Sequence, residues 1–285
     1  MKKRICIAAL ACLATGVVLA DGATATRNLL ANLAAGGQDI AIRLPDIYVS
    51  PTLVRGMYAL STAQGRLVGF TNEAGTLFGD AKGFNAQPRA GASFRPLTRE
   101  ESAGLRREMA AKIDKRQLIT VRYGAGKQEF FMFSAIDCPA CKAIEDELRS
   151  AKSENTTFYV IPSSLQKLSS QRGTQQWRKV AAIWCAPEAG QAWKRYWANG
   201  AVPPPNACPV AEPGAAARAH NQLWGMLQGA GVALIGTPSY LRMDGTKFTA
   251  ESTGTSREVA APVRWLMDSD AVEPLDFQPR PAAGG

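Results

Sequence analysis

The stretch FFMFSAIDCPAC, residues 130–141, decides the fold of this chain. Its first four residues are all apolar, and an apolar run without polar alternation is typical of a strand that is covered on both faces. After the two cysteines, Ile144 and Leu148 fall on one helical face, because residues four positions apart lie on the same side of a helix. The stretch therefore predicts a buried strand followed by a helix whose first turn holds the motif Cys-Pro-Ala-Cys.

The position of the two cysteines at a helix N-terminus predicts redox chemistry. The free N–H groups and the dipole at a helix start stabilise a thiolate, which lowers the pKa of Cys138 and makes it the nucleophile. Pro139 suits the first helical turn, where its missing N–H costs nothing. Cys141 can reach the same sulfur from within that turn and release a bound substrate by forming an internal disulfide.

Two other interpretations of the motif stay open, namely half of a zinc site and an inert structural disulfide. Zinc needs a second pair of ligands, but Cys185 and Cys208 are widely separated, and His220, the single histidine, lies beyond them. A single histidine also excludes a histidine-rich metal centre and most Ser-His and Cys-His nucleophile pairs. We interpret His220 as a residue on a helix surface.

Length and composition indicate a globular protein. The chain has 285 residues, of which 46% are hydrophobic and 20% charged, so two domains of ordinary size are expected. Beyond residue 20, no apolar stretch reaches the ~18 residues that a membrane-spanning helix needs. No basic run is interleaved with aromatic residues, so the sequence predicts no nucleic-acid partner.

The beginning of the chain predicts export. A basic start at 2–4 precedes an apolar run at 5–19, and short side chains at its end are typical of a signal peptide at 1–20 that is cleaved after about Ala20. An uncleaved membrane anchor is the alternative. Cleavage lowers the formal net charge from +9 to +6, because three basic residues leave, and keeps four of the six cysteines. An even number of cysteines in an oxidising compartment favours disulfides over metal ligation.

Upstream of the motif, the sequence predicts a small antiparallel sheet of short strands separated by turn residues, at 47–49, 57–60, 67–70 and 76–78. We expect this sheet to leave free edges and one apolar face, which a second copy of the chain could cover. Residues 84–96 contain Gln-Pro-Arg-Ala-Gly and are interpreted as a loop or linker. Thr98 and Glu101 form a capping box, which predicts a helix over about 99–115.

Around the motif, the sequence predicts further strands at 118–123, 128–133, 156–161, 236–243 and 247–250. A tight turn at Asp244-Gly245 joins the last two strands, and a final helix follows. A long segment before Thr237-Pro238 contains five tryptophans, which are more typical of the core of a helical subdomain than of a substrate groove: Trp177, Trp184, Trp193, Trp197 and Trp224.

Taken together, these segments resemble the DsbC/DsbG family of periplasmic protein-disulfide isomerases over nearly the whole chain after residue 20. Residues 57–78 look like the family's dimerisation module, 98–115 like its linker helix, and 131–141 like its catalytic strand and motif. Residues 182–186, AIWCA, are similar to a distinctive part of its helical insertion. Residues 236–238, Gly-Thr-Pro, resemble its cis-proline loop, which lies opposite the CxxC motif.

The resemblance implies an α/β chain, α+β overall, with a thioredoxin-like catalytic domain at 118–270. This domain would carry a helical insertion at about 163–232. A small antiparallel β dimerisation domain with its linker would occupy 21–97, and a linker helix 98–117. Residues 271–285 are expected to form a flexible tail, because they carry several prolines and end in Gly-Gly.

For the site, the resemblance implies two catalytic thiols, Cys138 as the attacking thiol and Cys141 as the resolving thiol. It implies contact between the substrate peptide and Thr237 with Pro238. No metal or organic cofactor is implied. The remaining cysteines would form a structural disulfide, Cys185 with Cys208.

The function that the resemblance implies is isomerisation or reduction of disulfides by a homodimer in the periplasm. Its partners would be exported proteins with cysteines or misformed disulfides, and a membrane thiol reductase of the DsbD type. Pro139-Ala140 is closer to the Pro-Tyr of the DsbG type than to the Gly-Tyr of the best-known isomerases, so the balance among isomerase, reductase and oxidase activity stays open. Two alternatives also remain: a DsbG-like reductase of sulfenylated cysteines, and a non-enzymatic holdase chaperone or appendage assembly factor.

Overall fold

The computed structural model describes residues 22–38, 46–124, 126, 128–150, 155–232, 234, 236–243, 245 and 247–248. The predicted signal peptide, final helix and tail lie outside the described residues, as does Asp244 of the predicted turn. None of the helices described is both long and apolar enough to cross a bilayer.

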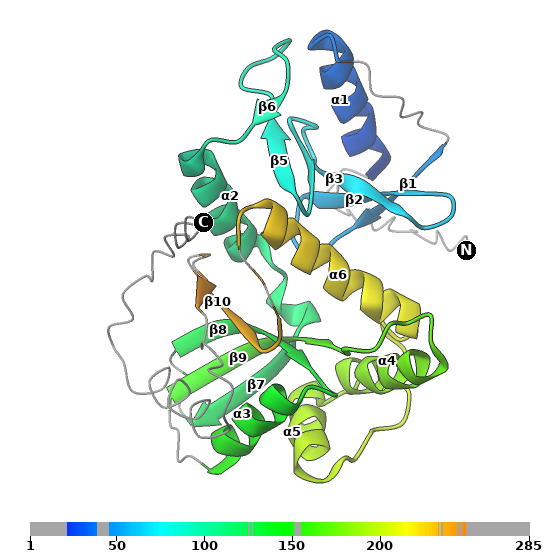
Figure 1. Ribbon diagram of the computed structural model, residues 1–285, viewed down its shortest axis with the longest axis vertical. Helices are drawn as coiled ribbons and strands as arrows, with labels where there is room; N and C mark the ends of the chain where they lie inside the picture. The colour runs from blue at the N-terminus through cyan, green and yellow to red at the C-terminus, as the bar shows by residue number, and fades with distance from the viewer. Residues whose placement is uncertain are drawn as a thin grey trace, which may run out of the picture.

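The N-terminal part is a six-stranded antiparallel sheet with helix α1 (Gly22–Ala35) packed on it (Figure 1). Every neighbouring pair of strands is antiparallel. The strands lie in the sheet in chain order: β1 (Ile47–Pro51), β2 (Met57–Thr62), β3 (Leu67–Asn72), β4 (Leu77–Asp80), β5 (Gly83–Ala86) and β6 (Arg95–Pro96). The predicted antiparallel sheet is present and is larger than predicted.

Residues 84–96 begin and end in strands of this sheet, with a loop at 87–94 between them, so the interpretation as a loop or linker holds only for the middle of the segment. They supply most of β5 and all of β6. Phe84 is buried, and the side-chain amide of Gln87 donates to the carbonyl oxygens of Asn32 and Ala92 at 3.1 and 3.0 Å. Contacts between distant parts of the chain therefore order a segment whose local composition is typical of a loop.

Helix α2 spans Arg99–Lys112, and its start confirms the predicted capping box. The Thr98 hydroxyl accepts from the Glu101 N–H at 3.2 Å, and the Glu101 carboxylate accepts from the Thr98 N–H at 2.8 Å. The helix ends earlier than predicted because Ile113 leaves the helical conformation, with φ −58° and ψ 125°. A separate 3-10 turn, η2 (Lys115–Gln117), follows.

The second sheet has five strands in the order β11-β10-β8-β9-β7. These strands are β7 (Ile119–Gly124), β8 (Gln128–Ala135), β9 (Asn155–Ser163), β10 (Ser239–Arg242) and β11 (Lys247–Phe248). The central strands β8 and β9 are parallel and are connected through helix α3 (Pro139–Ser150), whereas the other pairs are antiparallel. A mixed sheet in this order, with the cysteine helix after a central strand, is thioredoxin-like, so the predicted fold class is confirmed.

The chain between β9 and β10 forms three helices, α4 (Gln171–Trp184), α5 (Ala189–Asn199) and α6 (Pro213–Gly229). Trp224 is partly buried, with its ring centroid 5.2 Å from that of Phe133. The other four tryptophans of this region are buried: Trp177, Trp184, Trp193 and Trp197. This burial agrees with the interpretation of the tryptophans as core residues.

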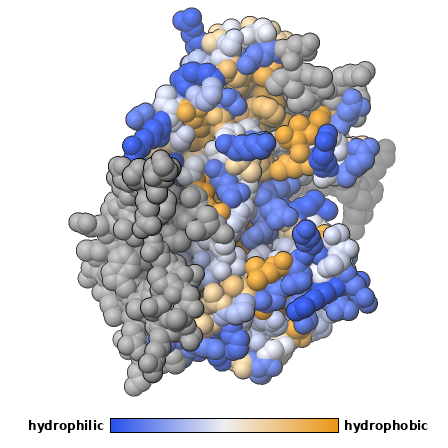
Figure 2. All heavy atoms as spheres, in the orientation of Figure 1, coloured by the Kyte–Doolittle hydropathy of each residue, from blue (hydrophilic) through white to orange (hydrophobic). Residues whose placement is uncertain are grey.

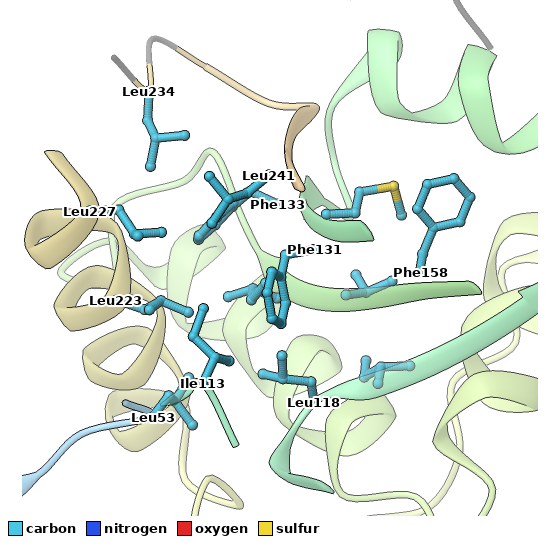
Figure 3. Close-up of a cluster of buried hydrophobic side chains, with 14 of the residues drawn as sticks. Leu53, Ile113, Leu118, Phe131, Phe133, Phe158, Leu223, Leu227, Leu234 and Leu241 are labelled. Carbon is cyan, nitrogen blue, oxygen red and sulfur yellow. The ribbon is translucent and has the colours of Figure 1, made fainter. Parts of the chain in front are cut away.

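The main core lies between α6 and the second sheet (Figure 3). Phe131 and Phe133 of β8 are 0% exposed and share this cluster with Leu223 of α6. On α3, Ile144 and Leu148 are also buried in the main core. Strand β8 is buried from its third residue to its last, which confirms that the apolar run is covered on both faces.

Both faces of the N-terminal sheet pack against helices of the same chain, so the expected free apolar face is reduced to the part around β1, where Tyr48 is 63% exposed. One set of its side chains, including Leu60, clusters with Leu29 and Leu33 of α1. Another set, including Phe70 and Phe84, belongs to the main core, and α6 packs against β4 and β5. Figure 1 shows α6 lying between the two sheets.

His220 is buried, so its interpretation as a residue on a helix surface is wrong. Its ring lies among those of Phe133, Trp177 and Trp224, at centroid distances of 5.8, 6.1 and 5.6 Å. Burial lowers the pKa of His220 to about 4, so the ring is neutral at neutral pH. The pattern of α6 could not indicate this burial, because a helix packed between two sheets has no single apolar face.

Candidate active site

Cys138 precedes α3, and its sulfur acts as the helix cap. The Cys141 N–H donates to Cys138 Sγ at 3.4 Å, which is the hydrogen bond that a capping Ser or Asp oxygen normally accepts. The Lys142 N–H donates to the Cys138 carbonyl oxygen at 3.0 Å and starts the helix. Pro139 is the first residue of α3. The Cys138 sulfur therefore lies at the positive end of the helix dipole, as the sequence predicted.

This environment lowers the pKa of Cys138 to about 6. The largest cause is a hydrogen bond with the Cys141 thiol, while burial opposes the shift. Backbone N–H groups of Cys141 and Ala140 lower the pKa further. With such a pKa, Cys138 is mostly thiolate at neutral pH, which is the form that attacks disulfides.

Alkylation of Cys138 by iodoacetamide should therefore follow a titration with a midpoint at about 6, well below the ~8.5 of a free cysteine. The rate should rise with pH up to this midpoint and level off above it, because only the thiolate reacts. Peptide mapping of samples quenched at intervals measures the rate at Cys138 separately from that at other residues. A midpoint at or above about 8 would contradict the helix-cap geometry.

The pKa of Cys141 is shifted in the opposite direction. Cys141 is 1% exposed, and burial raises the pKa of its thiol above the usual value, with the neighbouring Cys138 adding to the effect. The Cys138 sulfur therefore ionises readily, whereas the Cys141 sulfur keeps its proton. This asymmetry suits attack by Cys138 followed by displacement through Cys141.

The structure brings Thr237 and Pro238 next to Cys138, although they are distant along the chain. The Thr237-Pro238 peptide bond is cis. The Cys138 sulfur lies 3.3 Å from the Thr237 carbonyl oxygen, to which it donates a hydrogen bond when it is protonated. A substrate peptide whose disulfide reaches Cys138 would thus run beside this backbone.

Asp137, which sequence reasoning did not single out, connects the loop at 164–165 to the cysteine motif through hydrogen bonds. Its carboxylate accepts hydrogen bonds from the Ser164 hydroxyl and the Leu165 N–H, both at 2.8 Å. Leu165 is 55% exposed, so this loop presents a large apolar side chain beside the motif. Only the position of Asp137 directly before Cys138 could have indicated this role.

Glu145 of α3 is a second residue that sequence reasoning missed. Its side chain is buried, its Oε1 accepts from Trp193 Nε1–H at 2.7 Å, and its Oε2 accepts from the Tyr123 hydroxyl at 3.2 Å. Burial raises the pKa of the Glu145 carboxyl to about 7. A sequence signal was present, because Glu145 follows Cys141 by one helical turn and Ile144 by one residue, on the side of the helix predicted to be buried.

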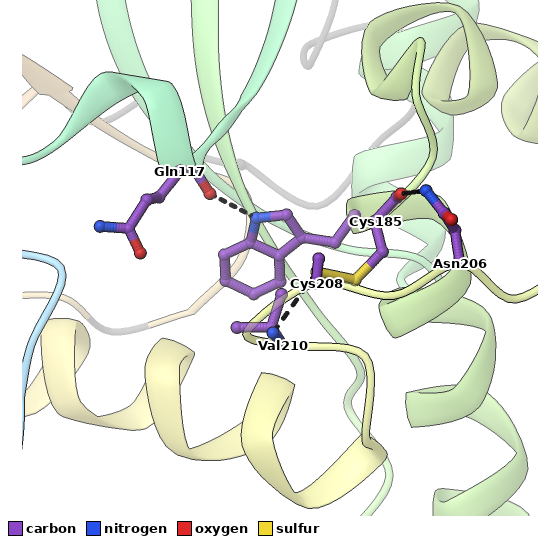
Figure 4. Close-up of a disulfide and its surroundings, with 6 residues drawn as sticks. Gln117, Cys185, Asn206, Cys208 and Val210 are labelled. Carbon is purple, nitrogen blue, oxygen red and sulfur yellow. Dashed lines mark hydrogen bonds between the residues drawn. A yellow bond between two sulfur atoms is a disulfide. The ribbon is translucent and has the colours of Figure 1, made fainter. Parts of the chain in front are cut away.

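Cys185 and Cys208 form a disulfide that links the end of α4 to the loop before α6 (Figure 4). The Asn206 side-chain amide donates to the Cys185 carbonyl oxygen at 2.9 Å, and the Val210 N–H donates to Cys208 Sγ at 3.4 Å. The two cysteines of the CxxC motif are free thiols. The four cysteines within the described part of the chain thus fall into two pairs with different environments.

Across the residues that the structure describes, no group of three or more His, Cys, Asp or Glu side chains is placed to hold a metal ion. The site contains the Cys138 thiolate at the start of α3 and the Cys141 thiol one helical turn further on. The backbone of Thr237 lies beside Cys138. These groups are sufficient for thiol–disulfide exchange.

Comparisons with known proteins give likenesses among solved structures. No protein-family model matches the chain, and no curated protein matches it. Among solved structures, the chain is similar to a disulfide interchange protein from Neisseria gonorrhoeae. The match covers 52% of this chain and 96% of that chain, with 24% sequence identity and a TM-score of 0.37. The function proposed below rests on the geometry of the thiols and not on this likeness.

Proposed function

We propose that this chain is a thiol:disulfide interchange protein that isomerises or reduces non-native disulfides in exported proteins. The observation that carries the proposal is the asymmetry of the cysteine pair. The Cys138 sulfur caps α3 and accepts from the Cys141 N–H at 3.4 Å, whereas Cys141 is 1% exposed. These environments lower the pKa of Cys138 and raise the pKa of Cys141. A reactive outer thiolate and a protonated inner thiol are what attack and release require.

The reaction begins when the Cys138 thiolate attacks one sulfur of a substrate disulfide. This forms a mixed disulfide and releases the other substrate sulfur as a thiolate. In isomerisation, a different substrate thiolate attacks the mixed disulfide, forms a new substrate disulfide and regenerates Cys138. In reduction, Cys141 attacks Cys138 instead, the substrate leaves with both thiols, and the two cysteines become a disulfide. Only this second route transfers two electrons to the substrate.

Thr237 and Pro238 are proposed to contact the substrate peptide during both routes. The hydrogen bond between the Cys138 thiol and the Thr237 carbonyl oxygen supports this role, because it puts peptide backbone beside the attacking sulfur. The reductive route needs an external electron donor, which we take to be a membrane thiol reductase of the DsbD type. The export signal predicted at residues 1–20 favours work in the periplasm, where disulfides form.

We further propose that two copies of the chain pair through β1. Within the described part of the sheet, β1 has a strand partner on one side only, β2. Tyr48 of β1 is 63% exposed and Leu67 of β3 is 40% exposed, and Figure 2 shows hydrophobic residues gathered over this part of the molecule. An open edge beside apolar side chains favours antiparallel pairing about a twofold axis, and a dimer would hold a substrate at two points.

The double variant Cys138→Ser/Cys141→Ser tests the proposal. It should lose all ability to rescue a scrambled multi-disulfide protein, because a hydroxyl does not exchange with disulfides under these conditions. Recovered activity of the scrambled protein is the readout, and the unfolding curve of the variant shows whether its fold is intact. In parallel, light scattering of an aggregating, cysteine-free protein measures chaperone activity. If the variant rescues the scrambled protein as well as the wild type does, the chain acts by binding alone and the proposal is wrong.

A further inference from the structure

Arg106 connects α2 to the end of α6. Its Nη1 donates to the Ala230 carbonyl oxygen at 2.9 Å, across 124 positions of the sequence. Ala230 is the C-cap residue of α6, and Figure 1 shows this end of α6 beside α2. Carbonyl groups at a helix C-terminus lack partners within the helix and lie at the negative end of its dipole, so a guanidinium group is favourable in this place.

The guanidinium group of Arg106 is partly buried among other cations. Burial lowers the pKa of Arg106, and the charges of Arg107 and Arg99 act in the same direction. Among the residues that the structure describes, no ion pair with a carboxylate compensates this charge. Removing a cation from water costs free energy. A role for Arg106 therefore has to come from what its hydrogen bond holds in place.

The segment that begins at Ala230 leads to Thr237, whose carbonyl oxygen lies 3.3 Å from Cys138 Sγ. Part of this segment is also held on α6, because the side-chain amide of Gln228 donates to the Leu234 carbonyl oxygen at 3.1 Å. Thr237 follows Leu234 by only three positions. The Arg106 hydrogen bond therefore fixes the start of the segment that carries the proposed peptide contact.

The same residue of α2 contacts the chain again after Thr237-Pro238. Gly245 lies between β10 and β11 and has a φ of +80°, which favours glycine. A Cβ atom added to Gly245 would lie 2.6 Å from the Arg106 carbonyl oxygen and 2.9 Å from the Arg107 nitrogen. These are backbone atoms, which cannot rotate away. Gly245 therefore lies directly against α2, so α2 contacts both ends of the segment 230–245.

The C-terminal end of α2 is hydrogen-bonded to the N-terminal part of the chain. The Arg55 N–H donates to the Lys112 carbonyl oxygen at 2.9 Å, and the Asp114 N–H donates to the Leu53 carbonyl oxygen at 2.8 Å. Leu53 and Arg55 belong to the connection between β1 and β2. One helix therefore joins the N-terminal sheet to the segment beside the reactive thiol.

We propose that Arg106 is a positioning residue for the substrate: through Ala230 it holds the Thr237 backbone where a peptide binds beside Cys138. The inference rests on the proposed function, in which Thr237 and Pro238 contact the substrate. Without the Arg106 hydrogen bond, a smaller fraction of molecules has this backbone in the binding-competent position. The apparent affinity for a peptide falls by that fraction, whereas a peptide that is already bound reacts at the same rate.

Single-turnover reduction of two disulfides by the pre-reduced, full-length chain without its signal peptide tests the inference. One substrate is a pair of short peptides joined by a disulfide, with a fluorophore on one and a quencher on the other. Its rate saturates as the enzyme concentration rises, which gives a half-saturating concentration and a limiting rate. The second substrate is Ellman's reagent, which has no peptide backbone and needs no contact with Thr237.

Arg106→Ala should raise the half-saturating concentration for the peptide disulfide about tenfold, near the low end of the effect expected when a hydrogen bond to a charged group is lost. The limiting rate and the reaction with Ellman's reagent should stay within about twofold of wild type. Arg106→Lys keeps a positive charge and a hydrogen-bond donor, so it should recover part of the lost affinity.

Arg107→Ala is the matched control, because it removes the same charge from the next residue of α2, which is exposed. This variant should change neither reaction by more than about twofold. Gly245→Ala disturbs the other end of the segment and leaves the Arg106 side chain intact. It should also raise the half-saturating concentration for the peptide, because the added methyl group pushes the chain away from α2.

Denaturant unfolding of each variant separates stability from substrate binding. If Arg106→Ala lowers stability but leaves the half-saturating concentration unchanged, Arg106 only caps α6 and the inference is wrong. Equal slowing with both disulfides, or an equal effect of Arg107→Ala, would contradict it as well. If Arg106→Ala does not fold, Gly245→Ala decides, and an unchanged half-saturating concentration in that variant overturns the inference. Failure of the proposed function would look different, since the wild-type protein would then reduce neither disulfide through Cys138.

Discussion

Cys141→Ala should accumulate mixed disulfides with exported proteins in cells, whereas Cys138→Ala should accumulate none. In the proposed reaction, the Cys138 sulfur at the start of α3 forms the covalent bond to substrate, so removal of Cys138 should abolish the adduct. Removal of Cys141 leaves attack possible but closes the internal route of release. We therefore expect mixed disulfides with Cys141→Ala and none with Cys138→Ala. Non-reducing gels of acid-quenched cells, with and without added reductant, measure the adducts.

The trapped variant also tests which sulfur binds the substrate. Mass spectrometry of an isolated adduct should find the substrate peptide linked to Cys138 and leave the Cys185–Cys208 disulfide intact. Release of substrate by other substrate thiols can lower the yield of adduct but cannot create one on Cys138→Ala. Equal adduct levels in the two variants would reverse or remove the roles assigned to the two thiols.

Local sequence signals predicted the parts of the site that depend on neighbours along the chain. The apolar run of β8, the helix start at Pro139 and the capping box of Thr98 with Glu101 are all formed by residues within a few positions of each other. Each of these patterns has a local physical cause, such as the missing N–H of Pro139 or the reciprocal hydrogen bonds of Thr98 and Glu101. The thioredoxin-like class was expected from the resemblance of these segments to the DsbC/DsbG family.

Other features depend on contacts between distant segments, and local patterns did not predict them. His220 is buried because α6 packs between two sheets, which no periodicity in α6 reveals. Glu145 is buried because Trp193 and Tyr123 supply its hydrogen-bond donors. The strands within 84–96 form because the rest of the sheet is there to pair with them. In each case tertiary contacts override the local preference.

The packing of the N-terminal sheet on α6 depends on a glycine, Gly229. A Cβ atom added there would lie 2.1 Å from the Asp80 carbonyl oxygen and 2.9 Å from the ring of Phe84. The first contact is with backbone, which cannot rotate away. Gly225, one turn earlier on α6, is different, because a Cβ atom there would lie 3.6 Å from the ring of Phe70, an ordinary van der Waals distance. The two glycines therefore form a matched pair on one helix.

Gly229→Ala should destabilise the protein by about 1–3 kcal/mol, the usual cost of forcing extra atoms into a packed interior. Gly225→Ala should stabilise it by up to about 1 kcal/mol, because alanine loses less backbone entropy than glycine in a helix. Denaturant unfolding of the two variants and the wild type measures the difference. Since Phe70 and Phe84 share the main core with Phe131 and Phe133, unfolding should remain a single transition. Equal effects of the two substitutions, or separate transitions for the two sheets, would show that the N-terminal sheet is not packed on α6 in solution.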